Sequence, residues 1–207
     1  MTKNDKTLIK KLNKKYTTNF DIHGDSPASV GWSSGKMNER FDLLFKGLRD
    51  YHSILDIGCG LGYLFKYLNN NNNNNNKDIQ YSGTEINPAF YDFCKKSYKN
   101  CNFYLQKDLT PSIDKKFDVV VMCGLLNTNI DNSTLPYDKI IDAAFKLSRK
   151  YITFNFLSKD VDFQDDHLNY SSLGAIVEYC ESRSKEIIIK KSSLLHEVTL
   201  SILVKND

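Results

Sequence analysis

Residues 53–63 read Ser-Ile-Leu-Asp-Ile-Gly-Cys-Gly-Leu-Gly-Tyr, an apolar run that leads into three closely spaced glycines. The run predicts a buried strand, and a helix is expected after it because apolar residues recur there at helical spacing: Leu61, Leu64, Phe65 and Leu68. Glycine lets the backbone of the turn pass close to a ligand, where a Cβ would collide with it. The first N–H groups of the helix have no partner within the helix and are available to that ligand. The stretch therefore predicts a strand, a turn and a helix that bind a ligand.

The glycine pattern differs from two common ligand-binding turns. A dinucleotide fingerprint, G-x-G-x-x-G, would place glycine where Tyr63 stands, and a phosphate loop would end in Gly-Lys-Ser/Thr, which is absent. Instead, an acid inside the strand precedes the glycines, in the order Asp56, Gly58, Gly60 and Gly62. These four residues are candidate ligand-binding residues, and a nucleotide-dependent oxidoreductase is the weaker alternative.

Beyond this unit, short apolar runs alternate with helical patterns. Strands are expected at 53–57, 79–83, 102–105, 117–122 and 151–157, with helices at about 61–68, 87–99 and 137–148. This alternation predicts a parallel sheet covered on both faces, because parallel neighbours need a crossover connection. After a helix at 172–181, the strands at 186–190 and 198–204 are too close in sequence for a crossover and must pair antiparallel. We expect a Rossmann-like, doubly wound α/β sheet, mostly parallel, with an antiparallel last strand.

Two amphipathic helices are predicted before the sheet begins. Apolar residues recur at helical spacing within 8–16 and 37–48, and the turn-forming residues between them indicate a loop. Eight consecutive asparagines, Asn69–Asn76, have no apolar surface to bury. We expect one globular domain, with helices that cover the ligand in residues 1–52, a core in 53–207 and a disordered asparagine loop at 69–76.

The composition excludes several classes of protein. The chain has 207 residues, 41% of them hydrophobic, and no apolar run approaches the roughly 20 residues of a membrane span. The N-terminus has no apolar signal region and the five scattered cysteines form no CxxC pair, so a cytoplasmic protein with reduced thiols is expected. Six lysines within residues 1–15 account for the net charge of +3, which argues against a large nucleic-acid footprint elsewhere. For that lysine face, a solvated surface and contact with nucleic acid or acidic lipid both stay open.

With its acid followed by G-x-G-x-G, the chain resembles the class I S-adenosylmethionine (SAM)-dependent methyltransferases. Glu85, after the second strand, stands where the family places the acid that accepts hydrogen bonds from both ribose hydroxyls. Gly58 and Glu85 are 27 residues apart, or 19 without the eight asparagines, close to the usual spacing of about 20. Asp108, after the third strand, matches the residue that binds the adenine amino group. The antiparallel last strand is also typical of the family, so the resemblance implies SAM as cofactor and the seven-stranded methyltransferase fold.

The substrate side carries weaker signals. After the fourth strand, residues 122–127 read Met-Cys-Gly-Leu-Leu-Asn, without the Asn/Asp-Pro-Pro-Tyr/Phe tetrapeptide of the family's amino-methylating nucleic-acid enzymes. The Asp residues of metal-dependent, catechol-type relatives are also missing, so we expect no metal. The acidic loop at 159–170 is a solvated loop, a metal cluster or an acidic mouth for a cationic substrate. His167 and His196 are candidate general bases or, alternatively, surface and capping residues.

The segment from Gly24 to Phe41, with Leu-His-Glu at 195–197, is similar to small stand-alone methyltransferases whose substrates are unassigned. We expect this segment to close over the cofactor, with Trp32 covering the methionine arm of SAM and Arg40 near its carboxylate, because arginine holds a carboxylate bidentately. The predicted function is methyl transfer from SAM to a small-molecule acceptor. Catalytic residues and oligomeric state stay open, and the alternatives are a catalytically silent SAM-binding protein and a tRNA or protein methyltransferase.

Overall fold

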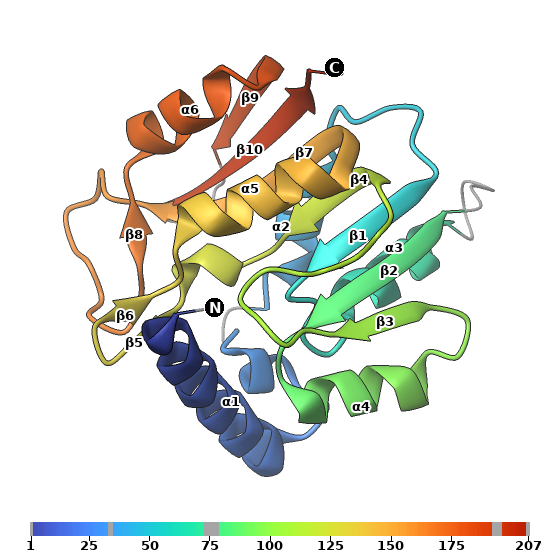
Figure 1. Cartoon of the computed structure of the whole chain (residues 1–207), viewed down its shortest axis with the longest axis vertical. Coiled ribbons are helices and arrows are strands. Elements are labelled where there is room, and N and C mark those ends of the chain that lie inside the picture. Colours follow the sequence, from blue (N-terminus) through green and yellow to red (C-terminus); the bar gives the residue numbers. More distant parts are fainter. Residues whose placement is uncertain (1, 33–34, 73–78, 192–195, 206–207) are drawn as a thin grey trace.

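The computed structural model describes residues 2–32, 35–72, 79–191 and 196–205, and it centres on one twisted sheet (Figure 1). The spatial order of its main strands is β3-β2-β1-β4-β7-β10-β9. Their bounds are β1 Ser53–Ile57, β2 Gln80–Glu85, β3 Asn102–Leu105, β4 Phe117–Met122, β7 Ser148–Ser158, β9 Ser184–Lys191 and β10 Glu197–Val204. Three short strands were not predicted: β5 Asn129–Ile130 pairs with β6 Ser133–Thr134, and β8 Tyr170–Ser171 pairs with β7.

The strand directions confirm the predicted sheet. β1, β2, β3, β4 and β7 pair in parallel, whereas β10 pairs antiparallel with both β7 and β9. In space, β10 lies one position in from the edge, because the closing hairpin places β9 outside it. The order reverses between β1 and β4, and ligands of such sheets bind beside the carboxyl ends of the strands at that point.

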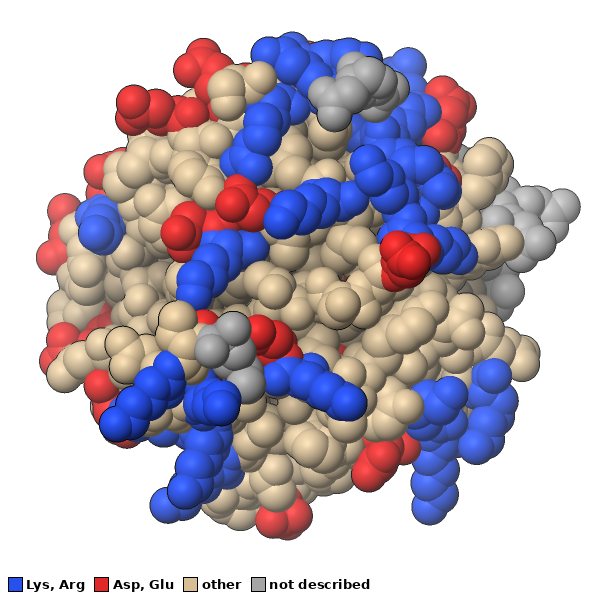
Figure 2. Space-filling model, in the orientation of Figure 1, with Lys and Arg blue, Asp and Glu red and all other residues tan. Residues whose placement is uncertain are grey.

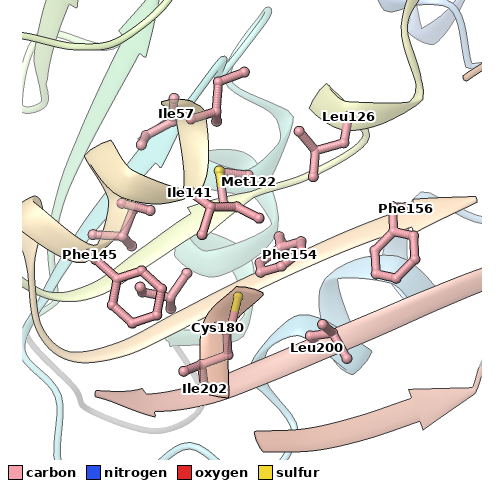
Figure 3. Close-up of a cluster of buried hydrophobic side chains, with 14 of the residues drawn as sticks. Ile57, Met122, Leu126, Ile141, Phe145, Phe154, Phe156, Cys180, Leu200 and Ile202 are labelled. Carbon is pink, nitrogen blue, oxygen red and sulfur yellow. The ribbon is translucent and has the colours of Figure 1, made fainter. Parts of the chain in front are cut away.

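Helices cover both faces of the sheet. α2 Met37–Phe45, α3 Tyr63–Asn72 and α4 Pro88–Ser97 pack on one face, and α5 Tyr137–Leu147 and α6 Leu173–Glu181 pack on the other. The central strands are buried on both sides, so Ile54 and Val119 join the first core while Leu55 and Val120 join the second. Figure 3 shows part of the second core, where Phe154 and Leu200 lie between the sheet and its helices. Such continuous apolar strands are typical of a parallel sheet with two covered faces.

The N-terminal segment crosses the carboxyl end of the sheet. It consists of α1 Lys3–His23 and the short 3₁₀ helix η1 Pro27–Val30, and α1 lies beside α4 and β5 (Figure 1). Leu8 and Leu12 of α1 are buried in the second core, and blue lysine side chains project outward over the same helix in Figure 2. The side-chain amide of Asn87 fastens α1 by donating to the Asn13 carbonyl (3.1 Å) and Thr17 Oγ1 (3.0 Å). The helices of residues 1–52 therefore share their packing with the core at 53–207.

The asparagine run begins inside a helix. α3 extends to Asn72, so the prediction of a disordered loop is wrong for Asn69–Asn72. Adding a residue to an existing helix gains a backbone hydrogen bond, and asparagine opposes this only by a fraction of a kcal/mol. Asn73–Asn76 lie outside the described residues. Among the helices of the described part of the chain, none is long and apolar enough to cross a membrane.

Candidate active site

A cavity lies at the carboxyl ends of β1, β2 and β4, beneath α1 and η1. Its enclosed volume is about 110 Å³, and its lining is mainly apolar. The candidate residues Asp56, Gly58, Gly60, Glu85 and Trp32 all line it. The structure thus brings together candidate residues from three separate parts of the sequence.

The glycine turn has a backbone that favours glycine. Gly58 and Gly60 have φ angles of +73° and +55°, and the N–H groups of Gly58 and Cys59 both donate to the Thr84 carbonyl at 2.9 Å. A Cβ on Gly60 would lie 2.9 Å from Val30 Cγ1 of η1. A side chain at position 60 would therefore collide with η1 even when no ligand is bound. Gly62, the last glycine of the motif, lies against the ring of Tyr98 and does not line the cavity.

Glu85 is held in a fixed orientation at the end of β2. Its Oε2 accepts from the Gly60 N–H at 2.8 Å, and its Oε1 accepts from the N–H groups of Ile86 (2.7 Å) and Asn87 (2.8 Å). Burial raises the pKa of Glu85 above its usual range, and these three hydrogen bonds oppose that shift. A carboxylate has about four acceptor positions, so acceptor capacity remains on Oε2. The geometry suits an acid that receives a further hydroxyl hydrogen bond.

Asp56 is a buried carboxyl group in the wall of the cavity. Its side chain is only 3% exposed, and Oδ2 accepts a hydrogen bond from the Tyr81 hydroxyl at 2.7 Å. Burial raises the pKa of Asp56 to about 7, against the lowering effect of the Tyr81 hydrogen bond. The carboxyl group is therefore close to half protonated at neutral pH, whereas sequence reasoning treated it only as a motif acid.

Asp108 lies at the side of the cavity rather than in its lining. Its Oδ1 accepts from the Leu109 N–H at 2.7 Å, and its side chain is half-buried. Its neighbours in the chain, Gln106 and Leu109, do line the cavity. The loop after β3 thus reaches the cavity with Asp108 beside its wall, and the contact of Asp108 with adenine stays a prediction.

Trp32 and Arg40 occupy different places. Trp32 lines the cavity and packs against Gly124, where an added Cβ would lie 3.2 Å from the indole Nε1. Arg40 lies over the Trp32 ring at 5.5 Å and pairs through Nε with Glu197 Oε2 at 2.8 Å. Its side chain is not part of the cavity lining. The expectation that Arg40 holds the methionine carboxylate stays a prediction, and the structure gives Arg40 an acidic partner that the sequence did not reveal.

Arg40 belongs to a buried polar chain that sequence reasoning missed. Asn155 donates to Glu197 Oε1 at 2.6 Å, and its own Oδ1 accepts from the Gly124 N–H at 2.7 Å. The chain links α2, β10, β7 and the loop after β4, and Glu197 is only 4% exposed. Asn155 lies within β7 and Glu197 begins β10, and no local spacing in the sequence connects them with Arg40. The network fixes Gly124, which forms part of the cavity wall.

Other reactive side chains do not form a catalytic group here. His167 and His196 are exposed and are not part of the cavity lining. No three His, Cys, Asp or Glu side chains gather as metal ligands in the ranges that the structure describes, the acidic loop at 159–170 included. Cys123 does line the cavity, and burial raises the pKa of its thiol well above the usual range. A buried, protonated thiol is a poor nucleophile.

Comparison with known proteins relates this chain to methyltransferases. A family profile described as "Methyltransferase domain" matches residues 55–135, which contain the glycine turn and Glu85. A Mycobacterium tuberculosis protein that is provisionally named a methyltransferase is 25% identical over 163 residues, 74% of this chain and 93% of its own length. Residues 55–135 thus match a methyltransferase domain, and the chain is similar to SAM-dependent methyltransferases.

Solved structures of methyltransferases share the fold of this chain at low sequence identity. The 1,6-didemethyltoxoflavin-N1-methyltransferase of Burkholderia thailandensis is 12% identical, with a TM-score of 0.69 over 98% of this chain and 91% of that one. The magnesium protoporphyrin IX methyltransferase of Synechocystis is 14% identical, with a TM-score of 0.65 over 97% of this chain and 100% of that one. Both structures contain S-adenosylhomocysteine. These likenesses confirm the fold predicted from the sequence.

Proposed function

We propose that this methyltransferase transfers the methyl group of SAM to a small molecule. The observation that carries the proposal is the covered cavity, because Leu12 and Tyr16 of α1 and Val30 and Trp32 of the following segment all contribute to its wall. A nucleic-acid strand or a folded protein would have to displace this cover to reach the interior. The Burkholderia relative, which holds 1,6-didemethyltoxoflavin, offers a precedent for a small acceptor on this fold.

The cavity has the polar groups that SAM needs. In the proposed arrangement the turn at Gly58 and Gly60 lies against the nucleoside, Glu85 accepts from the ribose, and Asp108 meets the adenine amino group. Trp32 then covers the methionine arm and Arg40 approaches its carboxylate. Among the described lining residues, Asp56 and Glu85 are acidic and none is Lys, Arg or His. This balance favours a ligand that carries a sulfonium cation, since an opposite charge at short range stabilises it.

Bound SAM would supply a methyl group on a sulfonium that leaves as a neutral thioether. The protein's own contribution is alignment, and holding two reactants in line supplies roughly 7–11 kcal/mol of a barrier. The covering segment also keeps water from the interior. A general base adds roughly 100- to 10,000-fold only where the acceptor must lose a proton in the transition state. The proposed mechanism assigns this role to no residue.

Calorimetry tests the cofactor half of the proposal. We expect one molecule of SAM to bind per chain, and Glu85→Gln to weaken binding at least tenfold, because a charged acceptor is lost. Glu178→Gln on the exposed surface of α6 is the matched control and should bind SAM as the wild type does. Absence of wild-type binding at millimolar SAM would refute the proposal.

Methyl-labelled SAM tests the acceptor half. The protein is incubated with a cell extract that has been separated into small molecules, RNA and protein, and label is expected only in the small molecules. Label confined to RNA or protein would replace the proposed acceptor class. Binding of SAM without label in any fraction would indicate a catalytically silent protein.

A further inference from the structure

Two hydroxyl groups meet inside the cavity, under its cover. Tyr16 belongs to α1, and Thr128 belongs to the loop after β4. Their oxygens lie 3.3 Å apart, although the residues are 112 positions apart in the sequence, and both side chains line the cavity. This hydrogen bond therefore links α1, which covers the cavity, to the loop after β4.

The surroundings of this hydroxyl pair are apolar. Leu12, Leu135 and Ile140 line the same cavity, and the Tyr16 ring packs against Phe90 with centroids 5.8 Å apart. A buried polar group costs free energy unless it is hydrogen-bonded, so a ligand here must offer a partner or leave the pair intact. The hydroxyl pair is consequently a polar feature of a mainly apolar lining, which also contains the acids Asp56 and Glu85.

The pair can donate one more hydrogen bond than it uses. Two hydroxyls carry two O–H donors, and the bond between Tyr16 and Thr128 consumes one of them. Burial raises the pKa of Tyr16, so its hydroxyl stays protonated and uncharged at neutral pH. One O–H donor therefore remains for a ligand, together with free acceptor positions on the oxygens.

The charges of the lining disfavour an anionic ligand. The lining residues within the described ranges include the acids Asp56 and Glu85, and no Lys, Arg or His faces them there. A phosphate or carboxylate on the acceptor would lose its hydration without gaining a cationic partner, because the lining offers none and the proposed arrangement uses Arg40 for the SAM carboxylate. A cationic acceptor would also gain little. Its possible partners in the lining are the two acids, and the bound sulfonium already neutralises part of their charge.

We propose that the Tyr16–Thr128 hydroxyl pair recognises the methyl acceptor, and that this acceptor is an uncharged, mainly apolar small molecule with one hydrogen-bonding group. The inference rests on the proposed methyltransferase function and adds to it the acceptor's chemical class. Tyr16 and Thr128 act as specificity-determining residues. The acceptor's polar group bonds to the pair while its apolar body lies against Leu12, Leu135 and Ile140.

The test separates possible acceptors by charge before the reaction. Small molecules from an extract of the producing cells are divided by ion exchange into anionic, cationic and neutral pools, and each is incubated with protein and tritium-labelled SAM. Label is expected in the neutral pool. At limiting amounts of that pool, Tyr16→Phe and Thr128→Val should lower the labelling rate about tenfold, the scale of one lost hydrogen bond.

Two measurements separate recognition from a merely structural effect. Both variants should bind S-adenosylhomocysteine within twofold of the wild type and should melt cooperatively. Tyr179→Phe removes a hydroxyl that bonds Asp142 between α6 and α5, away from the cavity, and should label the neutral pool at the wild-type rate. This matched control shows what the loss of a tyrosine hydroxyl does outside the site.

Several results would overturn the inference. Label confined to either charged pool would contradict an uncharged acceptor, and wild-type protein that binds SAM but labels no pool would also reject it. Unchanged labelling by Tyr16→Phe would remove the hydroxyl pair from recognition. Weaker binding of both S-adenosylhomocysteine and 5′-methylthioadenosine by that variant would place the pair in the cofactor subsite instead. Failure of the proposed function itself is distinct from label in a charged pool, since the wild type would then bind no SAM or leave every pool unlabelled.

Discussion

Replacing Asp56 by asparagine should change how the stability of the protein depends on pH. The carboxyl group is buried in the cavity wall, and its Oδ2 accepts a 2.7 Å hydrogen bond from Tyr81. Asparagine keeps an acceptor oxygen for that bond and has nearly the same shape, but it cannot ionise. The substitution therefore isolates the cost of a buried charge.

The expected magnitude follows from the pKa of Asp56, which burial raises from 3.8 to about 7. Because the folded state holds the proton more tightly than the unfolded state, this group stabilises the fold fully below pH 3.8. That contribution is lost as the pH rises to about 7, at about 1.4 kcal/mol per pH unit and about 4 kcal/mol in total. Asp56→Asn escapes the loss, so its stability relative to the wild type should rise with pH and level off above 7.

Urea unfolding of both proteins at pH 5, 6, 7 and 8 measures the effect. The difference in unfolding free energy, variant minus wild type, should grow by about 2–3 kcal/mol between pH 5 and pH 8. The other titrating groups are present in both proteins, and among them the charge of Glu85 acts on Asp56 and contributes to its raised pKa. A difference constant within about 0.5 kcal/mol would show that Asp56 titrates normally, and the argument from burial would fail.

Three further substitutions test other parts of the site. Gly60→Val should lower the unfolding free energy by about 1–3 kcal/mol even without a ligand, because its Cβ meets Val30 and its φ is positive; urea unfolding that matches the wild type would show that the turn adapts. Arg40→Ala should cost about 3 kcal/mol by leaving Glu197 buried without its cation, and adding Glu197→Gln should recover most of that loss, whereas additive losses would mean that the pair is not coupled. Asn87→Ala should cost about 1–2 kcal/mol through the lost cap of α4, and an unchanged thermal midpoint would contradict this role.

Local patterns accounted for most of the fold. Asn87 followed by Pro88 begins α4 as an N-cap and first helical residue, and the predicted bounds of β3 and β4 agree with those observed. The antiparallel direction of β10 followed from a connection too short for a crossover. Each of these features is determined by a few residues that are close together in the sequence.

Features that depend on distant residues could not be predicted in the same way. The motif located Gly60 and Glu85, which meet because β1 and β2 are adjacent. Arg40 and Glu197 are separated by 157 residues, and no spacing rule pairs them. For Asn69–Asn72 the local composition itself was misleading. It indicated a loop, whereas α3 continues through these residues. Likewise, nothing local to Tyr16 indicates that its hydroxyl meets Thr128.

The attachment of α1 has a consequence for the order in which the molecule forms and opens. α1 leaves the ribosome before Asn87, which holds Asn13 and follows it by 74 residues. Most of the stability of a helix in a protein comes from tertiary packing, so α1 is stabilised fully only once β2 and α4 exist. Because α1 depends on β2 and α4 for its packing, it should detach from the folded protein at a lower free-energy cost than the central strands. Its amide hydrogens should therefore exchange with solvent before those of β1 and β4. Ligands would then enter and leave while the N-terminal helix is briefly undocked.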